Sequence, residues 1–218
     1  MSLNARVFDD PAAVARAAAQ LVTSALEGGA GSLVLAGGST PKAAYQLLRP
    51  GPVWGRVSVL FGDERCVAPD DPESNYAMAQ QTLLARVGPA TVFRMPGELG
   101  AEEAARRYDE VLQRVGRLDL VLLGMGPDGH TASLAPGYRE DAGSSALAIP
   151  VHDFPKPPPD RVSLTLRALR SARRVVFVVT GEDKADAVLL ASEGRVPSGQ
   201  IDGAEYLLDR AAAAKLPA

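Results

Sequence analysis

The chain has 218 residues, enough for one large domain or, less readily, two small ones. Hydrophobic residues make up 46% of it and charged residues 22%, proportions typical of a globular protein with a buried core. The formal net charge of −3 argues weakly against a nucleic-acid-binding protein, and the single cysteine, Cys66, excludes an intramolecular disulfide.

Short apolar runs rich in β-branched residues alternate with longer helical patterns. The runs predict strands at residues 32–36, 57–61, 119–123, 161–166 and 175–180, and more weakly at 5–8, 91–94 and 147–150. The helical patterns cover residues 11–26, 41–48, 74–87, 101–115 and 183–193. This alternation predicts one α/β domain over residues 1–218, an open and mainly parallel sheet with helices on both faces.

Helix ends can also be located. Asp10 before Pro11 predicts a helix start, Gly28 with Gly29 predicts its end, and Thr40 before Pro41 repeats the start signal. In parallel sheets, ligands bind beyond the carboxyl ends of the strands. The loops after residues 36, 61, 123 and 180 are therefore the places to look for chemistry.

The first of these loops reads Gly37-Gly38-Ser39-Thr40. Glycines allow the backbone to approach a ligand closely, and the following helix offers free N–H groups and the positive end of its dipole. The loop suits a phosphate monoester, although a simple capped helix start is equally consistent with it.

The second loop contains Asp63, Glu64, Arg65 and Cys66. The carboxylates can orient sugar hydroxyls or a catalytic group, and Arg65 can hold an anion, but taken alone the group favours a solvated charge cluster. Cys66 has no base partner in the sequence and is interpreted as a bystander thiol.

The third loop, residues 124–131, contains a formal G-x-G-x-x-G before a predicted helix. A dinucleotide site is disfavoured because Asp128 would repel the pyrophosphate, and because no ribose-binding acid follows about 20 residues later. The glycines instead present Asp128 and His130 on a tight turn. A histidine at a ligand-facing strand end indicates a general base.

The fourth loop carries Lys184 at a helix start, where the dipole disfavours a cation. An anionic ligand would explain it, and so would pairing with a nearby acid. The sequence contains no G-x-S-x-G, H-E-x-x-H, Walker or paired C-x-x-C motif, which removes the serine-hydrolase, zinc-peptidase and P-loop classes.

Taken together, the loops resemble the 6-phosphogluconolactonase family, within the superfamily that includes glucosamine-6-phosphate deaminase. The matching stretches, in family order, are LAGGSTPKAAYQLL (35–48), FGDERCVAPDDPESNYAMAQQTLL (61–84), DLVLLGMGPDGHTASLAPG (119–137) and FPKPPPDRVSLTLRAL (154–169). The resemblance implies a Rossmann-like fold and hydrolysis of 6-phospho-D-glucono-1,5-lactone to 6-phospho-D-gluconate in the oxidative pentose phosphate pathway, without metal or cofactor.

Roles for residues follow from the same resemblance. His130 is implied to activate water, with Asp128 and Asp63 near it. The positions implied to bind substrate or its phosphate are Gly37, Gly38, Ser39, Thr40, Arg65, Arg161 and Lys184. The oxyanion stabiliser stays open between Arg65 and backbone N–H groups of the glycine turn.

Two alternatives remain. Amino-sugar phosphate deaminases or isomerases carry a glutamate five residues after the histidine, where this chain has Ala135. Non-catalytic sugar-phosphate sensing domains carry an upstream helix-turn-helix, for which the early first strand leaves no room. The family often has a bulkier residue at position 135, so Ala135 also marks a departure in packing.

The remaining expectations concern partners and compartment. The N-terminus lacks the apolar stretch of a signal peptide, and no apolar run reaches the roughly 20 residues that span a bilayer. We expect a cytoplasmic protein that binds a small sugar-phosphate lactone but neither nucleic acid nor membrane. We expect a monomer, and the resemblance leaves open a functional association with glucose-6-phosphate dehydrogenase.

Overall fold

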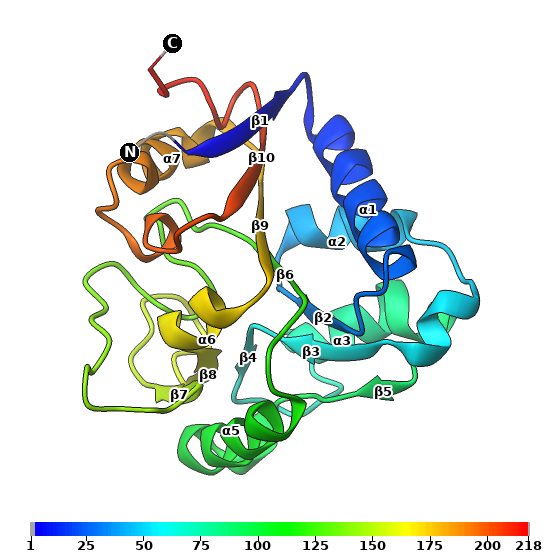
Figure 1. Cartoon of the computed structure of the whole chain (residues 1–218). Coiled ribbons are helices and arrows are strands. Elements are labelled where there is room, and N and C mark those ends of the chain that lie inside the picture. Colours follow the sequence, from blue (N-terminus) through cyan, green and yellow to red (C-terminus); the bar gives the residue numbers. More distant parts are fainter. Residues whose placement is uncertain (1–2, 218) are drawn as a thin grey trace.

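The computed structural model describes residues 3–217 and contains two sheets (Figure 1). The larger sheet has seven strands in the order β1-β10-β9-β6-β2-β3-β5, and all of its pairings are parallel. Its strands, in chain order, are β1 (Asn4–Phe8), β2 (Ser32–Leu35), β3 (Ser58–Phe61), β5 (Thr91–Val92), β6 (Leu120–Leu123), β9 (Arg174–Val179) and β10 (Glu205–Asp209). The predicted open parallel sheet is confirmed.

The smaller sheet is antiparallel, with the order β4-β8-β7. Its strands are β4 (Asp63–Arg65), β7 (Ala148–Val151) and β8 (Arg161–Leu164). Two expectations need correction. Neither the run predicted at 161–166 nor the weaker one at 147–150 joins the parallel sheet, and Asp63–Arg65, predicted as loop, forms a strand because it pairs with β8.

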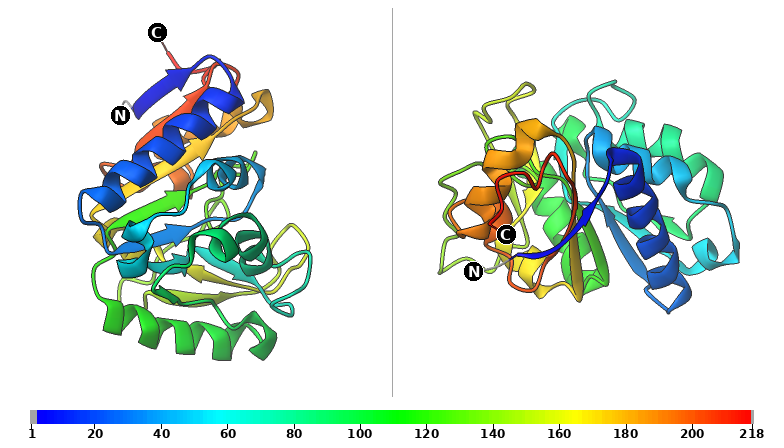
Figure 2. Two further views of the ribbon diagram at one scale, coloured as in Figure 1. Left: turned by 90° about the vertical axis from the view of Figure 1, so that its right-hand side faces the viewer. Right: turned by 90° about the horizontal axis from the view of Figure 1, so that it is seen from above.

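Helices cover both faces of the large sheet, as predicted. They are α1 (Pro11–Glu27), α2 (Ser39–Leu47), α3 (Asn75–Ala79), α4 (Ala85–Val87), α5 (Ala101–Val115), α6 (Leu166–Ser171) and α7 (Ala185–Ser192). A π-helical turn, Gln80–Leu84, joins α3 to α4. Two perpendicular views place α1 on one side of the sheet and α7 on the other (Figures 1 and 2).

Helix ends show where local signals hold and where they fail. Asp10 Oδ1 accepts from the Ala13 N–H at 2.7 Å, and Gly28 ends α1, both as predicted. The second start signal, Thr40 before Pro41, is wrong by two residues. Helix α2 begins at Ser39, with Gly38 at its N-cap and no side-chain cap. Gly38 has φ +101°, a conformation that favours glycine.

Three further elements differ from expectation. The helix expected directly after the third loop does not form. The Gly126 N–H donates to the His130 carbonyl and the Gly129 N–H donates to the Gly126 carbonyl, and these bonds fold the segment into turns. Helix α6 and strand β10 were not predicted. The Thr165 hydroxyl starts α6 by accepting from the Ala168 N–H.

Two buried tyrosines fix the strand ends from which the site loops leave. The Tyr45 hydroxyl, on α2, donates to the Ala36 carbonyl at 3.0 Å and accepts from the Ala36 N–H at 2.9 Å. The Tyr108 hydroxyl, on α5, donates to the Phe61 carbonyl at 3.1 Å and accepts from the Phe61 N–H at 2.8 Å. Each hydroxyl satisfies a backbone donor and acceptor where a strand leaves the sheet, which holds the loops in place.

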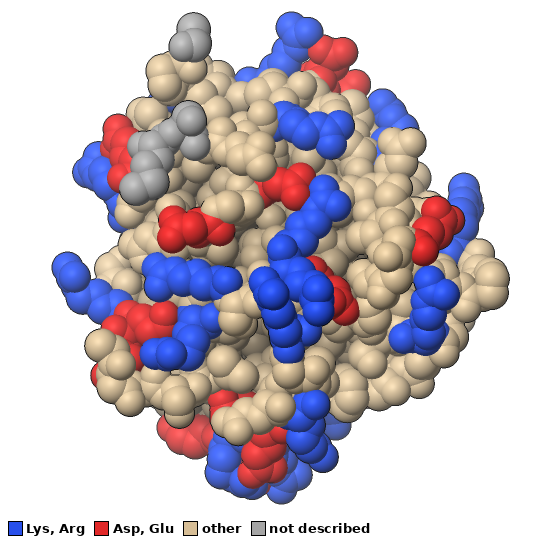
Figure 3. Space-filling view, viewed as in Figure 1, with Lys and Arg blue, Asp and Glu red and all other residues tan. Residues whose placement is uncertain are grey.

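The surface carries charges of both signs. On the face seen in Figure 3, Lys and Arg gather near the centre and are interspersed with Asp and Glu elsewhere. Among the helices within residues 3–217, none combines the length and apolar character needed to cross a membrane.

Candidate active site

A cavity of about 200 Å³ opens at the carboxyl ends of β2, β3, β6 and β9. All four loops singled out by the sequence contribute to it. The predicted residues that line it are Gly37, Gly38, Ser39, Thr40, Asp63, Arg65, His130, Arg161 and Lys184. Asp128 does not line the cavity and contacts His130 instead.

His130 is held by its own turn. Asp128 Oδ1 lies 2.6 Å from His130 Nδ1, and the His130 N–H donates to the same oxygen at 3.3 Å. A Cβ on Gly126 would lie 2.0 Å from His130 Nδ1, so only glycine lets the ring fold over the turn. Since an ionised carboxylate only accepts, Nδ1 carries the proton and Nε2 keeps its lone pair.

Opposing effects set the protonation of this pair. Burial lowers the pKa of His130 below its usual value, and the positive charge of Lys156 adds to that, while Asp128 and Asp63 oppose it. For Asp128, burial raises the pKa, but the charge and hydrogen bonds of His130 outweigh it and bring it below the usual value. The imidazole is therefore neutral near pH 7, as a general base must be.

Phe154 forms an apolar wall beside the histidine. Its ring meets His130 edge to face, with centroids 5.2 Å apart and planes at 89°. The Arg161 guanidinium lies over the Phe154 ring, 4.0 Å from its centroid. Phe154 is 4% exposed and so excludes water from one side of the imidazole.

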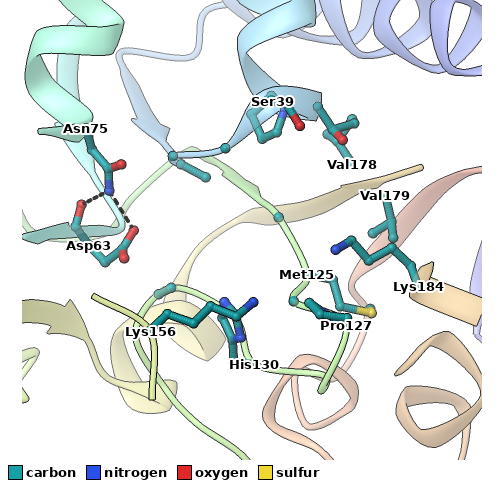
Figure 4. A pocket seen from close by; sticks show the side chains of 18 of the residues that line it. Ser39, Asp63, Asn75, Met125, Pro127, His130, Lys156, Val178, Val179 and Lys184 are labelled. Atoms are coloured by element: carbon teal, nitrogen blue, oxygen red, sulfur yellow. Dashed lines mark hydrogen bonds between the residues drawn. The ribbon is translucent and has the colours of Figure 1, made fainter. Parts of the chain in front are cut away.

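Asp63 is held by two side chains that sequence reasoning missed. Ser133 Oγ donates to Asp63 Oδ2 at 2.7 Å. Asn75 Nδ2 donates to Asp63 Oδ1 at 3.1 Å and to the Asp63 carbonyl at 2.9 Å, and Figure 4 shows this pair. A Cβ on Gly37 would come within 2.1 Å of Asn75 Oδ1. Gly37 is thus needed for the close approach of Asn75, and Asp63 acts as an acceptor that organises the cavity floor.

Glu64 does not reach the cavity, unlike its neighbour in sequence. Its carboxylate accepts from the backbone N–H groups of Asn75 at 2.7 Å and Tyr76 at 2.8 Å, and from Ser74 Oγ at 3.0 Å. Burial raises its pKa above the usual value. Glu64 holds the start of α3, and through it Asn75. The solvated charge cluster that the sequence favoured is wrong here, because Asp63 and Glu64 are both buried.

One end of the cavity has features that would suit an anion. Ser39 and Thr40 lie in the first turn of α2, where free N–H groups and the dipole favour negative charge. Thr40 Oγ1 lies 2.8 Å from Thr180 Oγ1, which joins this turn to the loop carrying Lys184. The Lys184 ammonium extends into the cavity (Figure 4) and lies 2.8 Å from Asp183 Oδ2.

The remaining cations have different partners. Arg65 Nη1 donates to the Glu73 carbonyl, and its buried Nε has no partner. Arg161 donates from Nε to the Pro158 carbonyl at 2.9 Å and from Nη2 to the Lys156 carbonyl at 2.8 Å. Arg161 therefore braces the proline-rich loop as well as lining the cavity.

Lys156 completes the lining and was not predicted as a site residue. It lies inside the quoted stretch FPKPPPDRVSLTLRAL, which was the signal available for it. Asn75 likewise lies in the quoted S-N-Y string. Local sequence does not predict that Asn75 and Lys156 point toward the cavity. Both residues lie on segments connected to the small sheet, and the packing of that sheet brings them to the cavity.

A second cavity, of about 260 Å³, is lined in part by Phe154, which does not line the first. Ala135 lines it and does not line the first cavity. The departure at position 135 therefore concerns packing at this second cavity.

Known proteins of one family are similar to this chain over most of its length. The family described as glucosamine-6-phosphate isomerases/6-phosphogluconolactonase matches residues 9–207. A 6-phosphogluconolactonase of Streptomyces coelicolor is 38% identical to the chain, over 94% of the chain and 90% of that relative. One of Rattus norvegicus is 37% identical, over 95% and 91%.

A solved structure is similar along its whole length. The 6-phosphogluconolactonase of Trypanosoma brucei matches with a TM-score of 0.86 at 26% identity, and the match covers 99% of each chain. On the family match and these identities, the chain belongs to the glucosamine-6-phosphate isomerase/6-phosphogluconolactonase family.

Proposed function

We propose that this protein hydrolyses 6-phospho-D-glucono-1,5-lactone to 6-phospho-D-gluconate in the oxidative pentose phosphate pathway. One observation carries the proposal: a neutral His130, oriented by Asp128 at 2.6 Å, lies in a cavity whose other end offers a helix N-terminus and Lys184. The relatives named 6-phosphogluconolactonase support the same reaction. Ala135, where a deaminase would carry glutamate, supports hydrolysis over deamination.

The chemistry needs one base and one charge stabiliser, because a δ-lactone is an activated ester. His130 Nε2 takes a proton from water as the water oxygen bonds to C1, and the carbonyl oxygen becomes an oxyanion. When the oxyanion collapses, the bond between C1 and the ring oxygen breaks. His130 returns its proton to that oxygen, so the base is regenerated.

Asp128 acts through the histidine. It fixes the tautomer that leaves Nε2 free, and its negative charge stabilises the imidazolium that forms during water attack. Asp63 helps to shape the cavity floor through Asn75 and Ser133.

A direct assay tests the reaction. The lactone is generated in place, and its disappearance is followed with and without the protein, after subtraction of its spontaneous opening. Faster disappearance supports the proposal. Binding of 6-phosphogluconate without turnover would instead support a sensing domain, and ammonia release from glucosamine 6-phosphate would support a deaminase.

The base is tested by His130→Asn, which keeps polarity and approximate size but removes the basic nitrogen. We expect kcat to fall by about 10²–10⁴, the usual contribution of general-base catalysis, with little change in binding of 6-phosphogluconate. His152→Asn is the matched control, since His152 is exposed and pairs with Asp160 and Glu102 outside the cavity. A folded His130→Asn protein with near-normal kcat would refute the mechanism.

We further propose a cytoplasmic monomer that works in functional association with glucose-6-phosphate dehydrogenase, which makes the lactone. The presence of one cysteine and hence no intramolecular disulfide supports a reducing compartment. Burial, followed by the charge of Asp160, raises the pKa of Cys66 to about 11, so its thiol stays protonated near neutral pH. Light scattering on the protein as it elutes from a size-exclusion column measures its molar mass, which for a monomer should be that of one chain, 22.8 kDa. Co-elution with the dehydrogenase, compared with each protein alone, measures the association.

A further inference from the structure

Four cations, Arg65, Lys156, Arg161 and Lys184, line the cavity, and they differ in the protein partners that they already have. Lys184 pairs with Asp183, Arg65 donates to the Glu73 carbonyl, and Arg161 donates to the carbonyls of the proline-rich loop. Within residues 3–217, the Lys156 ammonium has no hydrogen bond or ion pair. Among the described residues, Lys156 is thus the cavity cation whose charged group has no protein partner to give up when a ligand binds.

Lys156 also occupies a particular place. Figure 4 shows its side chain beside His130, on the opposite side of the cavity from Ser39 and Lys184. Its positive charge is felt by the imidazole, whose pKa it lowers. Of the two lysines that line the cavity, Lys184 therefore lies at the end proposed to bind an anion, and Lys156 lies at the end that holds His130.

The backbone at Lys156 is held in advance of any ligand. Pro155 and Pro157 flank it and restrict the backbone on both sides. Arg161 Nη2 donates to the Lys156 carbonyl at 2.8 Å, and the Phe154 N–H donates to the Pro159 carbonyl at 3.0 Å. The loop delivers the ammonium to the cavity from a fixed base, so little ordering of the backbone remains for the reaction.

We propose, resting on the lactonase function above, that Lys156 is a catalytic residue whose ammonium stabilises the oxyanion formed at C1. The attacking oxygen, which His130 deprotonates, and the carbonyl oxygen are bonded to the same carbon in the tetrahedral intermediate. A cation beside His130 is therefore next to the oxygen that gains charge. Arg161 and Phe154 are positioning residues in this arrangement, since they hold the loop.

The test distinguishes the role of Lys156 from that of Lys184 by comparing a phosphorylated and an unphosphorylated lactone. Lys156→Met removes the charge and keeps the length, and we expect kcat to fall about 10²-fold, the size typical of one lost oxyanion donor. The fall should be similar on 6-phosphogluconolactone and on unphosphorylated gluconolactone, with KM changed less than threefold. Lys156→Arg should recover part of kcat. Lys215→Met is the control, because Lys215 is exposed and pairs with Asp186 outside the cavity.

A second readout would not move if Lys156 were merely structural. The charged groups that act on His130 are Asp128 on its own turn, Asp63 on β4 and Lys156 on the proline-rich loop. Removing the lysine charge removes a cause that lowers the pKa of His130. The acid limb of the kcat profile in Lys156→Met should therefore move to higher pH.

Defined results overturn the proposal. A loss confined to the phosphorylated lactone would make Lys156 a phosphate ligand, and a loss below threefold on both lactones would make it a bystander. An unmoved acid limb would show that its charge does not reach His130. If the wild-type protein opened neither lactone, the lactonase function itself would fail. NMR titration of His130 in both proteins would then still test the placement of Lys156.

Discussion

At the scale of single residues, the environment of His130 is built from groups with opposite effects. Burial against Phe154 disfavours the imidazolium, whereas Asp128 favours it. A general base works best when its pKa lies near or below the working pH, because the neutral form must be present. The balance between Phe154 and Asp128 therefore sets the pH range in which this site can work.

This balance yields a prediction for Phe154. In Phe154→Ala, water regains one side of the His130 ring while Asp128 stays, so the pKa of His130 should rise. Activity needs the neutral imidazole and is lost as pH falls through that pKa, so the acid limb of kcat should move to higher pH. The measurement is kcat against pH between about 4 and 9, a range that brackets an ordinary histidine.

Phe154→Leu provides the control, since it keeps an apolar side chain against the ring. Its acid limb should lie closer to that of the wild-type protein. Truncation to alanine also costs about 3–5 kcal/mol of stability, the usual range for a buried phenylalanine, so profiles are compared only where both variants are folded. An acid limb that is unchanged in Phe154→Ala would assign the low pKa to some other wall.

At the scale of elements, the anion-binding end is formed by two strand-to-helix connections that meet. The β2–α2 turn contributes Ser39 and Thr40, and the β9–α7 connection contributes Thr180 and Lys184. The hydroxyls of Thr40 and Thr180, 2.8 Å apart, join the two connections, although these residues are 140 positions apart in sequence. A phosphate placed here would meet backbone N–H groups and one ammonium together.

The matching prediction concerns Lys184→Ala. A phosphate monoester carries close to two negative charges, so loss of the ammonium should raise KM and lower kcat/KM by tenfold or more, about 1.4 kcal/mol or above. Unphosphorylated gluconolactone should be a poor substrate and nearly indifferent to the change. Equal losses on both lactones would show that Lys184 does not anchor the phosphate.

At the scale of the whole molecule, two sheets share one site. The large sheet contributes the end of the cavity proposed to bind phosphate and the His130 turn, while the small sheet and its loops contribute Asp63, Arg161 and Lys156. Helix α5 packs against the small sheet, and its Tyr108 binds the end of β3 in the large one. We propose on this basis that residues 1–218 unfold as a single domain.

The whole site also predicts independence from added metal. The base and the positive charges that the proposed reaction needs come from side chains of the chain itself: His130 is the neutral base, and Lys156 and Lys184 are the cations. Within residues 3–217, no three His, Cys, Asp or Glu side chains gather as a metal site. Activity should be unchanged after exhaustive chelation and without nucleotide. Loss of activity on chelation, restored by a divalent cation, would contradict this expectation.

Several features of the protein could be predicted from sequence alone, because their causes are local. Buried β-branched runs alternating with helical patterns indicated the parallel sheet, and the Asp10 cap was correctly located. The four loops at strand ends converge because parallel strands all end at one edge. The Asp128–His130 pair is two residues apart on a glycine turn, so its contact needed no distant partner.

Other features depend on contacts between distant parts of the chain. Asp63 forms a strand only because β8 pairs with it, and Ser133 reaches it from 70 residues away. Lys156 and Phe154 join the site because Arg161 and the small sheet return the proline-rich loop to His130. Periodicity and turn signals report which face of an element is apolar, whereas these contacts are set by how whole elements pack. Sequence therefore determined the fold class and the histidine proposed as the base, and the tertiary structure decided what surrounds that histidine.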